Sequence, residues 1–142
     1  MSFGDTSRGF AEWSLGEDDA QPFFRQGVGS LPYSPLAQGR VCRPWGERTT
    51  RMDHDPVGHR FDLDDDAPIV DAVQRIAETR GVPMAQVALA WVLRNPVVTA
   101  PIVGATKPHH LTDAVAALDL TLTDDEVTAL EEHYRPHSPT AF

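Results

Sequence analysis

The sequence predicts an α/β fold, because short β-branched segments alternate with longer segments of helical periodicity. Residues 28–32 and 97–105 have the composition of buried strands. Two helices are predicted between these segments and two more after the second one. A strand that is followed by a helical crossover and another strand forms a right-handed unit with parallel strands. We therefore expect both strands to lie parallel in one sheet.

The first predicted strand follows a lead-in of uncertain order. Residues 1–26 mix glycine, aspartate and serine with scattered aromatic residues and have no sustained period, so we predict a weakly ordered segment with at most a remnant strand in "FAEWSLG". The strand at 28–32 is bounded by glycines before it and by prolines after it. Residues 41–67 are polar and long for a structureless connection, which predicts a mobile or functional loop.

The next two helices have clear boundary signals. Pro68 suits the first turn of a helix, and apolar residues recur at helical spacing until Gly81 ends it. These residues are Ile69, Val73, Ile76 and Ala77. A second helix starts at Pro83 with "MAQVALAWVLR" and ends at Asn95. It is apolar almost all round, so we predict that it is buried on most sides, with Met84 and Trp91 in the core.

Two further helices follow the second strand. Pro108 lies near the start of the third helix, whose apolar stripe consists of Leu111, Val115 and Leu118. A capping box at Thr123 and Glu126 predicts the start of the fourth helix. Its apolar face consists of Val127, Leu130 and Tyr134.

Composition and charge narrow the class of protein. The chain has 142 residues, enough for one domain, and a net charge of -9 that repels nucleic acids and anionic membranes. The single cysteine, Cys42, cannot form an internal disulfide, and it is more often an inert thiol than a nucleophile in such a setting. No apolar run approaches the roughly 20 residues of a membrane span, and the start lacks a signal-peptide core. We expect a cytoplasmic protein.

One turn has the composition of a phosphate site. In "VGATKPHHL" a glycine, a threonine and a lysine precede the start of a helix, which suits a phosphate group. In the alternative interpretation Thr106 caps the helix, Lys107 is solvated and Gly104 relieves crowding. Capping is the commoner role, so the turn by itself favours this alternative interpretation.

Three quoted stretches together resemble the C-terminal half of the aldo-keto reductase family. They are "GVGSLPYSPLAQGR", then "RTTR", then "PMAQVALAWVLRNPVVTAPIVGATKPHHLTDAVAALDLTLTDDEVTAL", and the similarity extends from about Trp13 to the end. The family consists of NADP-dependent reductases built on a (β/α)8 barrel. The resemblance implies a partial TIM barrel, with the last two or three parallel strands and their helices in a half-barrel at 27–142.

The resemblance also implies a site for NADP. Tyr33 would stack on the nicotinamide ring. The pyrophosphate would be wrapped by Ser34, Leu36, Gly39 and Arg40. The adenosine 2′-phosphate end would be held by Gly104, Thr106, Lys107, His110 and Asp113. Family members often have arginine at the position of His110 and a Glu-Asn pair at the positions of Asp113 and Ala114, so the sequence implies weaker adenosine contacts and leaves NADP and NAD open.

The catalytic residues of the family are absent from this stretch of sequence. The family's Asp, Tyr, Lys and His lie in the first half of the barrel, and no residue here matches them. A complete barrel takes about 250 residues, so we expect unpaired sheet edges and association with a copy or with a complementing N-terminal half. The leading hypothesis is the cofactor-binding half of a carbonyl reductase that is inactive alone. The alternative is a non-catalytic half-barrel that self-associates or binds a nucleotide.

Two other features of the 41–67 loop have ordinary explanations. His54 and His59 lie among several aspartates, but their spacing matches no established ligand motif, so we predict no metal site. Trp45 either lines the cofactor and substrate cavity, as the resemblance implies, or is an exposed aromatic residue in a turn.

Overall fold

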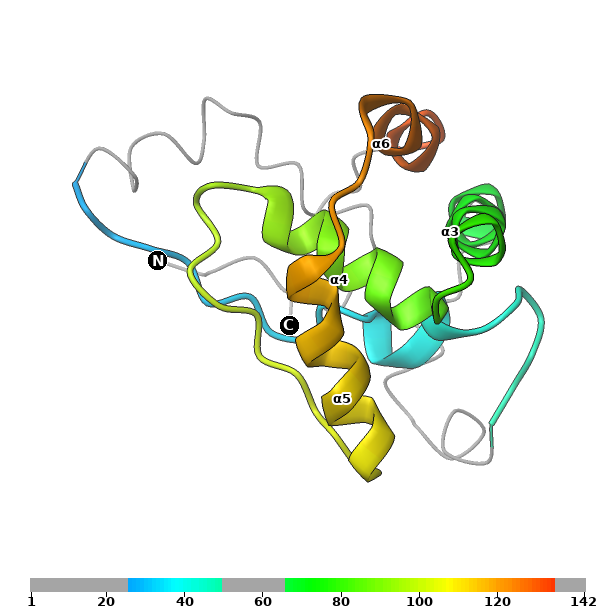
Figure 1. The fold of residues 1–142 in the computed structure, drawn as a ribbon, viewed down its shortest axis with the longest axis horizontal. Helices are drawn as coiled ribbons and strands as arrows, with labels where there is room; N and C mark the ends of the chain where they lie inside the picture. The colour runs from blue at the N-terminus through cyan, green and yellow to red at the C-terminus, as the bar shows by residue number, and fades with distance from the viewer. Residues whose placement is uncertain (1–25, 50–65, 135–142) are drawn as a thin grey trace, which may run out of the picture.

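A computed structural model describes residues 26–49 and 66–134 of the chain. Four α-helices and two 3-10 helices follow one another in this part (Figure 1). They are the 3-10 helix η2 (Ala37–Cys42), α3 (Ala67–Arg80), α4 (Met84–Arg94), α5 (Pro108–Ala116), the 3-10 helix η5 (Ala117–Asp119) and α6 (Asp124–Glu131). The four predicted helices are therefore confirmed. Residues 1–25 of the predicted lead-in and residues 50–65 of the polar loop lie outside the described residues.

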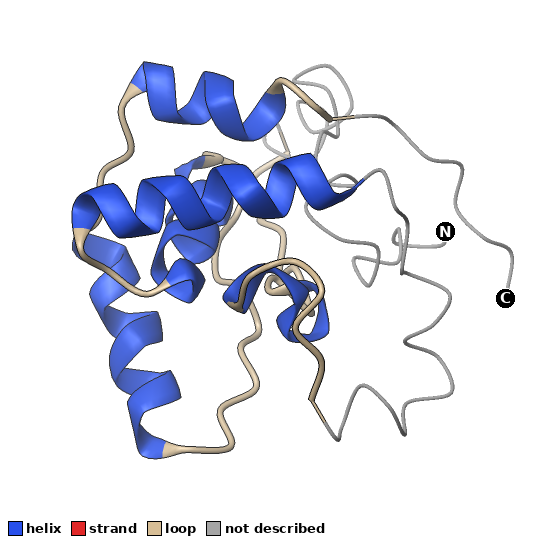
Figure 2. Cartoon of the chain, turned by 90° about the vertical axis from the view of Figure 1, so that its right-hand side faces the viewer, coloured by secondary structure: helices blue, strands red, loops and turns tan. Residues whose placement is uncertain are grey.

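The two predicted strands are neighbours but do not form strands in the described part of the chain. Two isolated parallel bridges join them, Ser30 to Val98 and Tyr33 to Ile102. Ser30 N–H donates to the Val97 carbonyl at 2.9 Å, and Ile102 N–H donates to the Pro32 carbonyl at 2.7 Å. Both segments are drawn as loops in Figure 2. The parallel arrangement is as predicted, whereas the expected strands at 28–32 and 97–105 are wrong.

Prolines give a physical reason for the short pairing. Pro32 and Pro101 have no N–H group to contribute to a ladder, so the bridges cannot extend regularly along the two segments. The described residues therefore contain two bridged segments and several helices in place of the partial barrel that the resemblance implies.

Helix α4 lies at the centre of the described part, in contact with α3, α5 and both 3-10 helices (Figure 1). Residues 87–90 and Val92 of α4 are buried, as its apolar sequence predicts. Met84 and Trp91 are partly buried and pack against the core.

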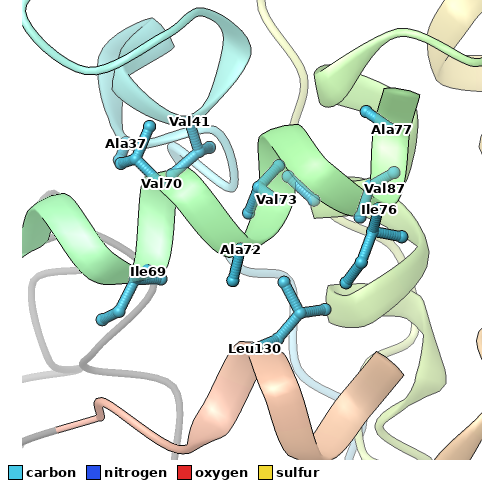
Figure 3. Close-up of a cluster of buried hydrophobic side chains, with 11 residues drawn as sticks. Ala37, Val41, Ile69, Val70, Ala72, Val73, Ile76, Ala77, Val87 and Leu130 are labelled. Carbon is cyan, nitrogen blue, oxygen red and sulfur yellow. The ribbon is translucent and has the colours of Figure 1, made fainter. Parts of the chain in front are cut away.

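The core forms where α3 packs between α4, η2 and α6 (Figure 3). All four apolar residues that predicted the α3 face are buried. Leu130 extends from α6 toward Ala72 and Ile76 of α3. Helix α3 ends where predicted, because Gly81 adopts a left-handed conformation, with φ 66°, and its N–H caps the Ala77 and Glu78 carbonyls.

Helix α5 differs from its prediction. The residues of the predicted apolar stripe, Leu111 and Val115 of α5 and Leu118 of η5, are 61%, 56% and 67% exposed, and no residue of α5 is buried. The buried contact is made by Ala117, the first residue of η5, directly after α5 ends. The helix therefore packs on α4 without using its apolar stripe.

Helix α6 begins at the predicted capping box. The Thr123 hydroxyl accepts from Glu126 N–H at 3.3 Å, and Glu126 Oε2 accepts from Thr123 N–H at 2.7 Å. Arg80 of α3 donates to both Glu126 carboxylate oxygens at 2.7 Å. One carboxylate thus serves as helix cap and as the partner of a bidentate arginine, which ties α6 to the end of α3.

Acid is expected to weaken this link between α3 and α6. The hydrogen bonds from Arg80 come first among the causes that lower the pKa of Glu126 from 4.5 to about 2. A carboxyl whose pKa is lower in the folded state stabilises the fold above its unfolded pKa, and this stabilisation is lost as the pH falls from 4.5 toward 2. We expect urea unfolding to show a loss of roughly 1 kcal/mol over this range that Glu126→Gln does not show. An equal pH dependence in Glu126→Gln would contradict this.

No helix in the described ranges 26–49 and 66–134 has the length and apolar character that crossing a membrane requires.

Candidate functional site

The two turns that the sequence singles out start from the same end of the bridged segments. The bridge between Tyr33 and Ile102 is parallel, so the chain leaves both residues in the same direction. The turn from Ser34 to Gly39 follows Tyr33, and the turn from Gly104 to Lys107 follows Ile102. Tyr33, which precedes the first turn, is 43% exposed. The parallel bridge therefore places the starts of the two turns at one end of the bridged segments.

The first turn has an unusual backbone. Ser34, Ala37 and Gln38 have positive φ angles of 53°, 48° and 58°, and Gly39 follows at 92°. Two hydrogen bonds close the turn, from Ala37 N–H to the Ser34 carbonyl at 2.9 Å and from Gly39 N–H to the Leu36 carbonyl at 2.7 Å. Left-handed residues other than glycine are uncommon and cluster at functional sites.

Arginines lie around this turn. Arg43 Nη1 donates to the Gly39 carbonyl at 2.9 Å, and a Cβ on Gly39 would lie only 3.3 Å from the same nitrogen. Gly39 therefore suits both the positive φ and the close guanidinium. Arg40 lines a small hollow together with Trp45 and Asp66. Trp45 lies at the edge of this hollow and is 37% exposed.

The second turn is open to solvent. Gly104, Thr106 and Lys107 are all exposed. Thr106 N–H donates to His110 Nδ1 at 3.4 Å, and the Thr106 hydroxyl lies at the same distance from that nitrogen. Lys107 is the N-cap residue of α5, and no side chain caps this helix. The alternative in which Thr106 caps the helix is therefore wrong, although Lys107 is exposed as that alternative required.

Gly104 is also not explained by crowding. A Cβ placed on Gly104 would meet no atom within 4 Å. Among the first N–H groups of α5, Pro108 has none and His110 N–H donates to the Lys107 carbonyl at 3.0 Å. No side chain caps this helix, so the positive end of its dipole lies beside the exposed residue Lys107. This combination of groups suits an anion.

His110 and Asp113 lie on the first turns of α5. The His110 ring packs against His109 in a T-shaped arrangement with centroids 4.5 Å apart. Asp113 Oδ1 accepts from Gln86 Nε2 of α4 at 3.4 Å. Asp113 is thus directed toward α4. Its carboxylate is also unsuited to bind phosphate directly, because both groups are negatively charged.

The lone cysteine lies in η2, directly after this first turn. Burial raises the pKa of the Cys42 thiol from 9.0 to about 11, against a smaller opposite effect of Arg43. The thiol is therefore protonated at neutral pH, which agrees with the inert role predicted for it.

The described residues contain no cluster of three or more potential metal ligands. His54, His59 and the aspartates between positions 53 and 65 lie outside the described residues.

Comparison with known proteins identifies the family. The profile described as "Aldo/keto reductase family" matches residues 19–135. The chain belongs to this family. An aldo/keto reductase relative, versiconal hemiacetal acetate reductase of Aspergillus parasiticus, is 37% identical over 115 residues, which are 78% of this chain and 33% of the relative.

Two other relatives show the same partial coverage. Putative aryl-alcohol dehydrogenase AAD16 of Saccharomyces cerevisiae is 36% identical over 116 residues, 79% of this chain and 33% of the relative. Norsolorinic acid reductase B of Aspergillus parasiticus is 35% identical over 121 residues, 82% of this chain and 32% of the relative. The chain spans about a third of the length of these curated aldo/keto reductase relatives.

Two residues of the first turn in this aldo/keto reductase chain are not among the predicted site residues. Gln38 has a positive φ and a buried carboxamide oxygen without a hydrogen-bond partner. Arg43 Nη1 donates to the Gly39 carbonyl. The only available signal was the position of Arg43, four residues after the glycine of "AQG".

Proposed function

We propose that the chain is the cofactor-binding part of an NADP-dependent oxidoreductase of the aldo/keto reductase family, built as the last strands and helices of a (β/α)8 barrel. The observation that carries this proposal is the parallel bridge between Tyr33 and Ile102, from which both candidate turns start at one end. A dinucleotide is long enough to need two such turns, one for its nicotinamide half and one for its adenosine half.

In this proposal each turn binds one part of the cofactor. Tyr33 orients the nicotinamide ring by stacking on it. The positive φ angles between Ser34 and Gly39, together with Leu36 and Arg40, shape the pyrophosphate loop. On the second turn the groups that hold the 2′-phosphate are Gly104, Thr106, Lys107 and His110. Asp113, which faces α4, contributes on the adenine side.

These residues suit the phosphate groups of NADP. Lys107 and the N-terminus of α5, which no side chain caps, provide positive charge at one exposed place. His110 is a weaker ligand than arginine, because a neutral imidazole cannot grip phosphate in a bidentate way. We therefore propose binding of NADP that is weaker than an arginine at this position would give.

The reaction class is the reduction of a carbonyl compound to an alcohol. The bound cofactor supplies the hydride, and a proton must reach the carbonyl oxygen from an acid. No residue of this chain is assigned as that acid, so we propose that the chain alone has no turnover. The acid belongs to the part of the domain that this sequence does not span, which makes a complementing N-terminal half the partner that activity requires.

Binding of NADPH by the full chain tests this proposal. Replacing Lys107 with methionine should weaken NADPH binding about 10- to 100-fold in a calorimetric titration, because a charged hydrogen bond contributes about 1.5–3 kcal/mol. The affinity for NADH, which lacks the 2′-phosphate, should stay unchanged. Arg94→Met is the matched control, because Arg94 is an exposed cation at the last residue of α4. It comes before the 97–105 segment, whereas Lys107 comes after it. Equal loss for NADH, or no binding at all, would contradict the proposal.

The exposed apolar residues favour a second candidate function. Val28, Leu31 and Ile102 of the bridged segments are 50%, 61% and 57% exposed. A chain with such a surface could act as a self-associating interaction protein without catalysis. Sedimentation equilibrium tests this candidate, which requires the chain alone to form a stable dimer.

A further inference from the structure

An arginine contacts the backbone of the first turn, which runs from Ser34 to Gly39. Arg43 Nη1 donates to the Gly39 carbonyl at 2.9 Å, and both residues are partly buried. A guanidinium bound to a carbonyl makes a charge-assisted hydrogen bond, which is stronger than a bond between neutral groups. Because a peptide group is planar and rigid, this bond fixes the orientation of the peptide between Gly39 and Arg40.

The conformation of the first turn is one that its own residues do not favour. Glycine adopts positive and negative φ with similar ease, so Gly39 alone does not fix its φ of 92°. Ala37 and Gln38, with φ of 48° and 58°, lie in the left-handed region, which is unfavourable for residues with a Cβ. Among the described residues Gln38 also has a buried carboxamide oxygen without a hydrogen-bond partner, which is a second cost. Such a conformation persists only where its surroundings enforce it.

The residues after Arg43 direct its side chain toward this contact. Pro44 restricts the preceding residue to extended backbone, and Arg43 has φ -151° and ψ 160°. Glu47 N–H donates to the Pro44 carbonyl at 3.2 Å, and Gly46 has a φ of 85°, so residues 44–47 form a tight turn. The chain therefore leaves η2 at Arg43 in a direction that the following proline and turn define.

We propose that Arg43 is a positioning residue that holds the first turn in the conformation that binds the pyrophosphate. The hold on the backbone rests on the contact with the Gly39 carbonyl, whereas its effect on affinity rests on the proposed function. A turn that adopts its binding conformation for only a fraction of the time binds with an affinity lowered by that fraction. NADPH and NADH share the pyrophosphate, so loss of Arg43 lowers both affinities by one factor. Arg43 thus differs from Lys107, whose loss should affect NADPH alone.

Hydrogen exchange of single amides in the full chain tests the hold on the backbone without cofactor. The reporters are the N–H groups of Ala37 and Gly39, which make hydrogen bonds of 2.9 and 2.7 Å within the turn. Arg43→Met should raise both exchange rates about tenfold, because a hydrogen bond to a charged group stabilises a conformation by at least this factor.

Two controls separate a local effect from a loss of stability of the whole fold. Val82 N–H donates to the Ala77 carbonyl at 3.0 Å just after α3, and its exchange should stay unchanged in Arg43→Met. Arg75→Met removes an exposed arginine of α3 and should change neither the first turn nor Val82. Arg43→Lys keeps a charged donor and should recover most of the protection that Arg43→Met loses. An unchanged Gly39 exchange rate in Arg43→Met, an equal rise at Val82, or an Arg43→Lys variant no better than Arg43→Met overturns the proposal.

Calorimetric titration of the same variants measures the effect on binding. Arg43→Met should weaken NADPH and NADH about threefold to tenfold, and by the same factor. Weaker binding with unchanged Gly39 exchange overturns the positioning role in favour of direct contact between Arg43 and the pyrophosphate. Raised exchange with unchanged affinities overturns the role in binding. Raised exchange in a chain whose parent binds neither dinucleotide supports the hold on the turn and contradicts the proposed function, so the two can fail separately.

Discussion

Replacing Leu130 with alanine is expected to lower the free energy of unfolding by about 2–5 kcal/mol. Leu130 is 1% exposed and is the residue of α6 that enters the main core cluster, where it faces Ala72 and Ile76 of α3 (Figure 3). Alanine removes the buried apolar contact and leaves a cavity that the two helices can close only in part. Because small domains have about 5–15 kcal/mol of stability in all, this loss is a large fraction of it.

Urea unfolding followed by circular dichroism measures the effect, and α6 provides a matched control. Thr128 is exposed on the same helix, and its hydroxyl donates to the Asp124 carbonyl within the helix at 2.8 Å. Thr128→Ala should therefore change the free energy of unfolding by no more than about 0.5 kcal/mol. A Leu130→Ala variant as stable as this control would mean that α6 does not pack on α3 as described.

The helices could be predicted because their signals are local. The capping box at Thr123 and Glu126 fixes the start of α6 by hydrogen bonds between residues three apart. Gly81 ends α3 because it adopts a left-handed conformation at little cost. The burial of α4 follows from its composition, since a helix that is apolar all round has no face suited to water.

The short pairing of the two bridged segments and the exposure of the apolar side chains of α5 could not be predicted in the same way. A β-branched run indicates a strand only where neighbours pair with it, and Pro32 and Pro101 limit that pairing here. The spacing of Leu111 and Val115 indicates an apolar face, but it does not say what covers that face. Strand pairing and helix burial both depend on which other segments pack against the residues, and a local sequence pattern does not give this.

The cofactor roles of the two turns stay predictions, and the conformation of the first turn could not be predicted from the sequence. The resemblance names the residues of both turns, and the parallel bridge shows that both turns start at one end of the bridged segments. The left-handed conformation of Ala37 and Gln38 had no sequence signal, because residues other than glycine adopt it only where their surroundings enforce it. The capping role considered for Thr106 failed because the helix starts one residue later, with Lys107 as its N-cap.

Replacing Gly29 with alanine is expected to cost about 1–3 kcal/mol of stability and to disturb both candidate turns. A Cβ on Gly29 would overlap the Thr99 hydroxyl and lie 3.0 Å from the Thr99 Cβ. Thr99 N–H donates to the Ser30 carbonyl at 2.9 Å, so the two backbones cannot separate without stretching this bond. Because the same segments lead to Tyr33 and to the Lys107 turn, any separation at Gly29 also shifts these turns relative to each other.

A double-mutant cycle tests whether the close approach of Thr99 is the cause. Thr99→Gly removes all three side-chain atoms that the new methyl group would meet. The cost of Gly29→Ala should therefore be much smaller in a Thr99→Gly background, with a coupling of at least about 0.5 kcal/mol between the two changes. Strictly additive free energies of unfolding would show that Gly29 is required for another reason. The same cycle can be measured for NADPH affinity. If the two substitutions couple in affinity as they do in stability, the pairing of the two segments holds the two turns at the spacing that a dinucleotide needs.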